Sequence, residues 1–265
     1  MDRYVLVTNA STQLGKELVQ RLIVENYLVF ACDPTFDNKE FGNLISLNLN
    51  PNKLESLKQA KKYIQKCTSK IHAIIHLNSY HAYGAMVEAK EEELKLSLEK
   101  NFFEVFRINQ EFWDLVEQRS GKIIHDCADV SLFALAPFNG IYSLSKTMLS
   151  NYVDILRREL MFRMINVVRV HRGILKDNNF EKIIDKYYNA MDDSKFFYTE
   201  INRFFPLNID KENLVEVLEY TNFLINIINE PKVQPVYYFK INSKLSKINK
   251  HSLKKVDKLF RKISK

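Results

Sequence analysis

Short apolar segments alternate with longer amphipathic segments along most of the chain. Tyr4 to Thr8 is a compact apolar run, and the apolar residues from Leu14 to Ile23 then recur at helical spacing. This pattern predicts a strand, a polar turn and a helix. Five further runs have strand length: residues 28–32, 44–47, 71–76, 122–125 and 167–170. Helices are predicted over residues 54–64, 91–118 and 142–163.

The alternation predicts an α/β fold with a doubly wound, Rossmann-like parallel sheet. Parallel strands are joined by right-handed crossover helices, which cover both faces of the sheet. Ligands of such sheets bind beyond the carboxyl ends of the strands, so functional residues are expected just after each strand. Residues 178–205 are aromatic and charged without a clear period, and we interpret them as an insertion that covers the substrate.

The formal net charge of +7 comes from the end of the chain. Residues 241–265 hold nine Lys or Arg and one Asp, which leaves 30 of the 39 basic and 31 of the 32 acidic side chains elsewhere. Charge confined to one tail argues against a nucleic-acid partner. Apolar residues recur at three- and four-residue steps from Ile241 to Ile263, which predicts one basic amphipathic helix. We therefore divide the chain into a Rossmann-like domain, 1–240, and this helix, 241–265.

Two roles remain open for the C-terminal helix. Its apolar face can pack on the body or on a partner subunit, which is the common arrangement in soluble proteins. The alternative is peripheral contact with an anionic membrane surface. No run approaches the roughly 18 apolar residues of a membrane span. The three cysteines are widely spaced and fit no disulfide framework, so we expect a soluble, cytoplasmic protein.

Tyr142 and Lys146 are the first candidates for chemistry. They are four residues apart on a predicted helix, so their side chains lie on one face. A free Tyr titrates near pKa 10, and an adjacent Lys cation favours the phenolate. The pair can therefore act as a general acid and base. The alternative is a solvated start of a helix, since this spacing occurs on many helices.

In the order of its motifs the chain resembles the short-chain dehydrogenase/reductase family over roughly residues 1–240. The turn at residues 8–15, TNASTQLG, is similar to the family's glycine-rich cofactor turn, and residues 171–173 look like its Pro-Gly turn. Tyr142 and Lys146 match its catalytic pair, and Asn101 stands where its active-site Asn is found. The resemblance implies hydride transfer between a nicotinamide cofactor and a carbonyl or secondary alcohol. It also implies a homo-oligomer acting on a small molecule, with a lipid-like substrate as one option.

The resemblance also implies roles for single residues. Tyr142 would give or take the proton, Lys146 would tune it and hold the nicotinamide ribose, and Asn101 would organise a proton-relay water. The implied cofactor-binding residues are Thr8, Asn9, Leu14, Gly15, Asp33, Asn78, Tyr142, Lys146, Gly173 and Ile174. Asp33 follows the second strand, where a carboxylate binds ribose hydroxyls and repels a 2′-phosphate, so NAD is predicted over NADP. The alternative for Asp33 is a turn-forming role before Pro34.

Two departures from the family pattern bear on activity. Asn9 and Gln13 replace glycines of the cofactor turn; Asn tolerates positive φ, whereas the Gln13 side chain must turn aside from the phosphate. Where the family has its catalytic Ser, this chain has Ala128 or Asp129. Losing such a hydrogen-bond donor costs on the order of 10² in rate unless Ser131 or Asp129 substitutes. The alternative function is therefore a catalytically inactive Rossmann-fold protein for nucleotide sensing or partner binding.

A metal site is not predicted. The histidines at positions 72, 76, 81 and 125 show no recognisable ligand spacing, and no carboxylate or cysteine completes a set.

Overall fold

A computed structural model describes residues 3–133 and 136–265, so the first two residues of the expected domain lie outside it. Eight strands form one sheet in the order β10-β7-β6-β5-β1-β2-β4-β3. Their bounds are β1 Tyr4–Thr8, β2 Leu28–Asp33, β3 Lys39–Phe41, β4 Leu44–Asn48, β5 Ala73–His76, β6 Lys122–Asp126, β7 Asn166–Arg172 and β10 Val236–Phe239. Neighbours are parallel except β3 and β4. The predicted α/β class and doubly wound parallel sheet are confirmed, with β10 as a further parallel strand and β3 as an antiparallel edge.

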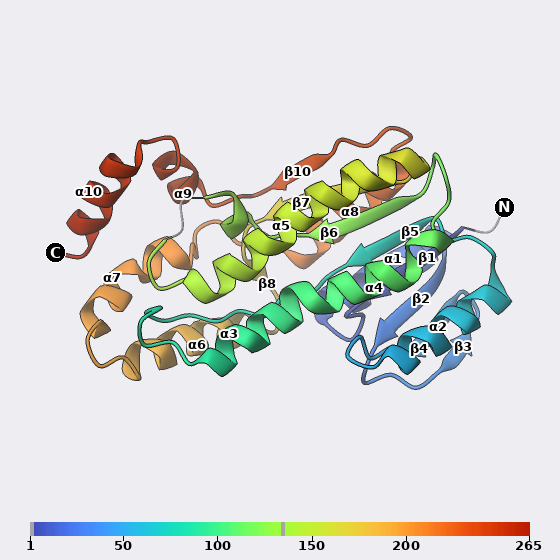
Figure 1. The fold of residues 1–265 in the computed structure, drawn as a ribbon, viewed down its shortest axis with the longest axis horizontal. Coiled ribbons are helices and arrows are strands. Elements are labelled where there is room, and N and C mark those ends of the chain that lie inside the picture. The colour runs from blue at the N-terminus through green and yellow to red at the C-terminus, as the bar shows by residue number, and fades with distance from the viewer. Residues whose placement is uncertain (1–2, 134–135) are drawn as a thin grey trace.

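The sheet carries a separate hydrophobic core on each face, because successive residues of a strand point to opposite sides. Val5 and Val7 of β1 pack with α1 (Gln13–Val24) and α8 (Val217–Asn229) on one face. Leu6 joins the other core, which is covered by three helices: α2 Leu54–Cys67, α4 Glu104–Phe112 and α5 Gly140–Leu160. Figure 1 shows these helices flanking the sheet.

The long helix predicted over residues 91–118 is interrupted. It consists of α3 (Glu91–Leu98), a π-helical turn η1 (Glu99–Phe103), α4 and a 3₁₀ turn η2 that ends at Leu115. A π turn adds a residue to the helical turn and is frequent at functional sites. Here it contains Asn101, one of the predicted site residues.

Residues 178–205, interpreted as aperiodic, form most of two helices. These are α6 (Phe180–Asp192) and α7 (Tyr198–Asn208). Their apolar side chains form a third core cluster with Tyr83. A two-stranded parallel sheet of β8 (Leu175–Lys176) and β9 (Val215–Glu216) lies beside them in the sequence.

The C-terminal tail forms two helices and not the single predicted one. They are α9 (Ser243–Ile248) and α10 (Leu253–Ile263). Leu245 of α9 is buried in a cluster with Leu207 of α7, and the ring of Phe260 of α10 lies 5.6 Å from that of Phe204. The apolar side of the tail thus packs on the body. Figure 1 shows α9 and α10 at the same end of the molecule as α7. No helix within the described ranges is long and apolar enough to cross a membrane.

Candidate functional site

The turn between β1 and α1 has the shape of a phosphate cradle. Asn9 adopts a φ of 52°, the left-handed conformation for which glycine is otherwise used. Thr12 caps α1 by accepting a hydrogen bond from the Gly15 N–H at 3.1 Å. A Cβ at Gly15 would lie 2.5 Å from the Asn9 carbonyl oxygen, so only glycine fits there. The free N–H groups at the start of a helix attract anions, and this turn presents them beyond the sheet edge.

Gln13 turns aside, as the phosphate space requires. Its side-chain oxygen accepts a hydrogen bond from the Asn178 N–H at 2.7 Å, in the segment that leads into α6. Thr8 lies beneath the turn, buried, with its hydroxyl 3.3 Å from the Ile75 carbonyl oxygen and 3.3 Å from Asn78 Oδ1. Asn78 is buried as well, and its amide donates to the Lys100 carbonyl oxygen.

Asp33 closes β2 beside this turn. Its carboxylate accepts hydrogen bonds from the Ser11 hydroxyl at 2.6 Å and from the Thr35 hydroxyl and N–H at 2.6 and 3.0 Å. The bond from the Thr35 N–H is the turn-forming role considered for Asp33. The same contacts place the carboxylate at the sheet edge next to the turn after β1, where a ribose-binding role requires it.

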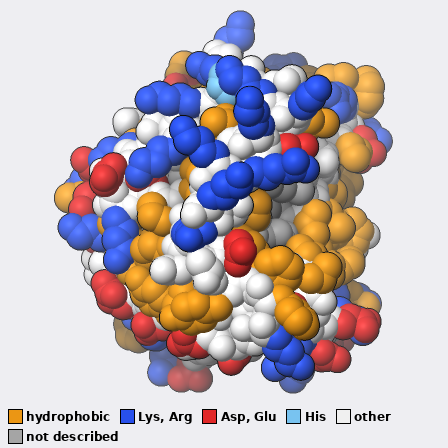
Figure 2. Space-filling view, turned by 90° about the vertical axis from the view of Figure 1, so that its left-hand side faces the viewer, with side chains coloured by type: hydrophobic (Ala, Val, Ile, Leu, Met, Phe, Trp, Pro, Cys, Tyr) orange, Lys and Arg blue, Asp and Glu red, His pale blue; other side chains and the backbone are white. Residues whose placement is uncertain are grey.

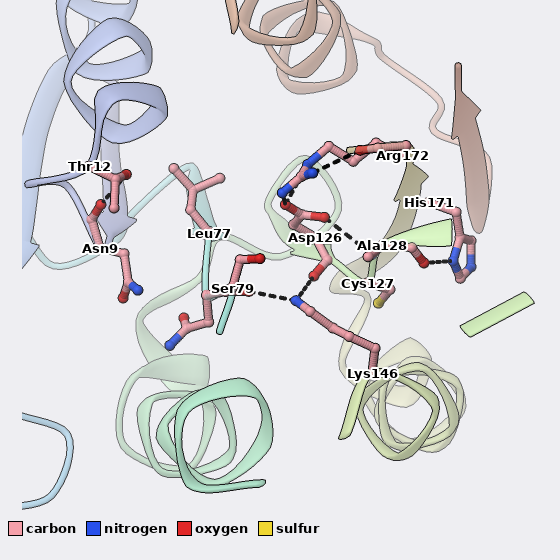
Figure 3. A network of polar contacts seen from close by, with 12 residues as sticks. Asn9, Thr12, Leu77, Ser79, Asp126, Cys127, Ala128, Lys146, His171 and Arg172 are labelled. Atoms are coloured by element: carbon pink, nitrogen blue, oxygen red, sulfur yellow. Dashed lines mark hydrogen bonds and ion pairs between the residues drawn. The ribbon is translucent and has the colours of Figure 1, made fainter. Parts of the chain in front are cut away.

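Lys146 is fully buried on α5 and joins the ends of two strands. Its Nζ donates to the carbonyl oxygens of Asn78 at 2.5 Å and Asp126 at 2.9 Å, as drawn in Figure 3. Burial disfavours the ammonium form and lowers the pKa of Lys146 to about 8, against the opposing effect of the Asp126 carboxylate. Because this pKa is close to neutral, the protonation of Lys146 can change when the neighbouring phenol gains or loses its proton.

Tyr142 is buried one turn before Lys146. Its hydroxyl lies 3.4 Å from Ser79 Oγ, and its ring stacks on His81 with 4.1 Å between centroids. The Lys146 Nζ is 6.0 Å from the centre of the same ring. Burial raises the pKa of Tyr142 well above its usual value, although Arg172 acts in the opposite direction. The phenol is therefore protonated at neutral pH and suited to donating a proton.

Asn101 in the π turn η1 connects α5 to the loop after β5. Its amide nitrogen donates to the Ser145 hydroxyl and to the Tyr80 carbonyl oxygen, each at 2.9 Å. Its amide oxygen accepts from the Tyr80 N–H at 2.8 Å. The side chain thus fixes the backbone of Tyr80 from both sides; a role in holding a water stays a prediction.

Arg172 and Asp126 form a buried ion pair that the sequence did not predict. The guanidinium lies 2.7 Å from Asp126 Oδ2, and both side chains are at most 3% exposed. In the turn at residues 171–173, Arg172 stands at the position of the Pro in the Pro-Gly turn that this segment resembles. The two residues are 46 positions apart, and only the pairing of β6 with β7 brings them together at the sheet edge. Figure 3 shows the pair above Lys146.

A cavity of about 260 Å³ opens between these elements. The residues that line it include Asn9, Thr12 and Leu14 from the first turn, Ser79 and His81 from the loop after β5, Arg172, and Lys182 and Lys186 of α6. Arg172, Lys182 and Lys186 line it together with Asp177 and the start of α1, and cations and the N–H groups of a helix start are donors that can bind a pyrophosphate. The residues present therefore fit a dinucleotide cofactor.

A smaller hollow adjoins this cavity. It is lined by Tyr142, Asp129, Asn139, Gly173 and Ile174, and it shares His81 and Arg172 with the larger one. A Cβ at Gly173 would lie 2.4 Å from the Lys240 carbonyl oxygen, so the chain needs glycine there. The predicted residues Leu14 and Ile174 thus border the two spaces, one in each.

In the described part of the turn after β6, residues 127–133, no serine hydroxyl lies beside that of Tyr142. Ala128 takes a φ of 54°, and the Ser131 hydroxyl donates to its carbonyl oxygen at 2.8 Å and lies 3.0 Å from His171 Nδ1. Asp129 accepts a hydrogen bond from the Asn242 N–H at 2.7 Å. Burial raises the pKa of Asp129 to about 7. Of the two substitutes considered, Asp129 borders the Tyr142 hollow, and Ser131 is engaged with His171.

The histidines on β5 and β6 belong to the core. The rings of His76 and His125 stack with 4.7 Å between centroids, and each lies 2.9 Å from the amide of Asn109. Among residues 3–133 and 136–265, no three His, Cys, Asp or Glu side chains are grouped so that they could hold a metal ion.

Comparison with known proteins identifies relatives of the chain. The sequence model of the family described as short chain dehydrogenase matches residues 3–187. A 17-beta-hydroxysteroid dehydrogenase type 6 of Bos taurus is 25% identical over 184 residues, which are 66% of this chain and 57% of that protein. A 3-ketodihydrosphingosine reductase of Bacteroides thetaiotaomicron is 26% identical over 64% of this chain and 62% of its own. The chain thus matches about six tenths of the length of these two relatives.

Solved structures show the same fold. A short-chain dehydrogenase from Streptomyces avermitilis superposes with a TM-score of 0.75 at 14% identity, covering 98% of each chain. One from Burkholderia cenocepacia, in complex with NADP, has a TM-score of 0.71 at 16% identity and covers 99% of this chain and 97% of its own.

Proposed function

Because this chain belongs to the short-chain dehydrogenase family, we propose that it is an NAD(P)-dependent oxidoreductase acting on a carbonyl or secondary alcohol. The observation that carries the proposal is the position of Tyr142, a buried and protonated phenol in a hollow that shares His81 and Arg172 with the phosphate-suited cavity. A proton donor and a cofactor site thus lie side by side. A protonated phenol is the form that can give a proton to a carbonyl oxygen, as the reduction of a ketone requires.

The residues divide the work between binding and proton transfer. The start of α1 with Asn9 and Thr12 would hold the pyrophosphate, and Asp33 would bind the adenosine ribose. The cofactor, when bound, supplies the hydride for a carbonyl carbon. The Tyr142 hydroxyl transfers its proton to the carbonyl oxygen as its O–H bond breaks, and the carbonyl oxygen becomes the hydroxyl oxygen of the alcohol. Lys146 stabilises the phenolate that remains, because an opposite charge nearby favours the ionised form.

The substrate proposed is a lipid-like ketone. The relatives named above include a hydroxysteroid dehydrogenase and a 3-ketodihydrosphingosine reductase, by their printed names.

Exposed apolar side chains on α5, among them Met148 and Ile155, offer a surface for a second copy of the chain. A homo-oligomer in the cytoplasm is therefore part of the proposal.

The rival function is a catalytically inactive protein that serves nucleotide sensing or partner binding. It is favoured by Ala128, which leaves the family's serine position without a hydroxyl, and by Lys146, whose Nζ is engaged by two backbone oxygens. The oxidoreductase proposal requires both cofactor binding and turnover, whereas the rival requires no turnover.

The test compares Tyr142→Phe with wild type. We expect turnover to fall at least about a hundredfold, because the variant lacks the proton donor, while cofactor affinity changes by less than about twofold. Affinity is measured by fluorescence titration with NADH and NADPH, and turnover by loss of reduced cofactor with 9,10-phenanthrenequinone and long-chain and steroid ketones. Tyr188→Phe is the matched control, since this half-exposed ring stacks on Phe205 outside the site.

Each outcome separates the proposals. A Tyr142→Phe variant with wild-type turnover would remove Tyr142 from the chemistry. Wild-type protein that binds a cofactor but reduces none of the ketones supports the non-catalytic rival. Protein that binds neither cofactor contradicts the oxidoreductase proposal and favours the rival in its partner-binding form.

A further inference from the structure

The loop after β5 brings a serine hydroxyl to Tyr142 from an unexpected direction. Ser79 Oγ lies 3.4 Å from the Tyr142 hydroxyl. Ser79 is exposed and borders the larger cavity, so a substrate can reach it. Two hydroxyl groups at this separation can each hydrogen-bond to one further oxygen atom about 2.8 Å from both. The place that a carbonyl oxygen would take is therefore already framed by two donors.

The loop that carries Ser79 is held firmly. The Asn101 amide makes two hydrogen bonds to the backbone of Tyr80, the next residue, at 2.8 and 2.9 Å. On the other side, Lys186 of α6 donates to the His81 carbonyl oxygen at 2.9 Å, and its Nζ lies 3.8 Å from the centre of the Tyr80 ring. Donors fixed before the reaction stabilise developing charge without reorganising, which is the requirement for catalysis of this kind.

A row of hydrogen-bond contacts leads from Ser79 through His81 to Tyr83. His81 Nε2 lies 3.2 Å from Ser79 Oγ, and His81 Nδ1 lies 3.1 Å from the Tyr83 hydroxyl. His81 is neutral, because burial and the nearby cations of Arg172, Lys146 and Lys186 hold its pKa well below the usual value. A neutral imidazole has one donor and one acceptor nitrogen. If the Tyr83 phenol donates to Nδ1, then Nε2–H donates to Ser79 Oγ, and the Ser79 hydrogen is free for the substrate.

We propose that Ser79 is a catalytic residue, whose hydroxyl holds the substrate carbonyl oxygen together with the Tyr142 phenol, and that His81 is a positioning residue behind it. The inference rests on the proposed oxidoreductase function. In the reduction, Ser79 donates a hydrogen bond and keeps its proton, while Tyr142 transfers its own to the oxygen. Ser79 thus supplies from the loop after β5 the donor that Ala128 lacks in the turn after β6.

The geometry favours Ser79 over the other two candidates. The Ser131 hydroxyl donates to the Ala128 carbonyl oxygen and meets His171, so its hydrogen is already used. The Asp129 carboxyl is held by the Asn242 N–H at 2.7 Å, whereas it is Ser79 whose hydroxyl contacts the Tyr142 hydroxyl.

The kinetic test uses Ser79→Ala, with 9,10-phenanthrenequinone as the carbonyl and reduced nicotinamide cofactor. We expect kcat to fall on the order of 10²-fold with unchanged cofactor affinity, the usual effect of removing one such donor. Ser79→Thr keeps the hydroxyl and should retain turnover within a few-fold. Ser131→Ala is the matched control and should behave as wild type.

The role of His81 is tested by a double-mutant cycle. His81→Phe keeps a ring over Tyr142 and removes both nitrogen contacts, and we expect about a tenfold loss in kcat with little change in KM. The Ser79→Ala/His81→Phe double variant should be no slower than Ser79→Ala, since His81 acts through Ser79. Additive losses would show that His81 serves the structure independently of Ser79.

A second measurement does not depend on activity. Long-range ¹H–¹⁵N spectra of histidine-labelled protein, assigned with the His81→Phe variant, should show His81 protonated on Nε2. Protonation on Nδ1 would make Nε2 an acceptor that takes the Ser79 proton, and the inference would be overturned. Wild-type turnover in Ser79→Ala would overturn it too, while leaving the proposed oxidoreductase function intact. Wild-type protein without turnover on any ketone fails the proposed function itself, and the catalytic role with it.

Discussion

At the scale of single residues, Asp33 is the side chain that we expect to favour NAD over NADP. Its carboxylate is held in place by Ser11 and Thr35 at the edge where an adenosine ribose would lie. A fixed negative charge accepts hydrogen bonds from ribose hydroxyls and repels a 2′-phosphate. Two cations act in the other direction: Lys16 and Lys39 border a neighbouring cavity of about 390 Å³. Lys39 is already paired with Asp37 at 3.0 Å, which weakens its attraction for a phosphate.

We therefore expect NADH to bind more tightly than NADPH, and Asp33→Ala to narrow the ratio of their dissociation constants about tenfold, equal to about 1.4 kcal/mol. Fluorescence titration of wild-type protein and of Asp33→Ala with NADH and NADPH measures these dissociation constants. Asp257→Ala removes an exposed carboxylate on α10, away from the cofactor turn, and serves as the control. Tighter binding of NADPH by wild-type protein would show that the cations dominate.

A sequence reveals those functional residues that stand a few positions apart on one predicted element. Tyr142 and Lys146 could be found because a four-residue step on a helix places two side chains on one face, and the structure has both on α5. Ser79 and His81 could not, because their approach to Tyr142 depends on a loop whose course follows from Asn101 and Lys186. Such contacts join distant positions of the chain and leave no periodic signal.

At the scale of elements, the tail is bound to the body by specific contacts. The Asn242 N–H donates to Asp129 and its amide to the Leu207 carbonyl oxygen at 3.0 Å, and Leu245 is 3% exposed. The two cores that cover the sheet are built from residues before position 240. The tail therefore closes one edge of the molecule and is not part of either main core.

Ending the chain after Lys240 should leave a folded protein that is less stable by about 2–4 kcal/mol, the cost of uncovering one buried leucine and its neighbours. Urea unfolding followed by circular dichroism measures the loss. Ending the chain after Ser252 removes only α10 and keeps Asn242 and Leu245, so it should cost less. Failure of the shorter chain to fold would show that the tail is integral to the domain, and an unchanged midpoint would show that its contacts contribute nothing.

The elements differ in how well the sequence predicted them. Six of the eight strands of the central sheet, together with α1, α2 and α5, followed from the pattern of apolar residues, because each buries a regular face; β3 and β10 were missed. The tail shows the same periodicity across its break, so its division could not be seen; residues 249–252 form the turn, and Ser252 is the N-cap of α10. β10 was missed because its four residues are only partly buried and carry no alternation.

At the scale of the whole molecule, positive charge gathers over the two tail helices. Figure 2 shows Lys and Arg side chains crowded on the upper part of that face, with hydrophobic and acidic side chains below. The exposed cations of α10 are Lys254, Lys255, Lys258, Arg261 and Lys262. The apolar side of α10 is meanwhile directed to the body, where Val256 is 3% exposed. The surface can thus attract anions, but it holds few apolar side chains that could enter a bilayer.

We therefore expect adsorption to anionic lipid vesicles through charge alone. Full-length protein should sediment with vesicles rich in phosphatidylserine at low ionic strength and be released as salt rises, because charge attraction is screened over about 10 Å at 0.1 M. The triple variant Lys254→Glu, Lys258→Glu and Lys262→Glu reverses one stripe of α10 and should abolish sedimentation. The matched control reverses the exposed stripe Lys58, Lys62 and Lys66 of α2, which changes net charge equally and should leave it intact. Binding that survives high salt would mean that apolar residues of the tail leave the body and insert. Equal loss in both variants would mean that net charge, and not this surface, determines the adsorption.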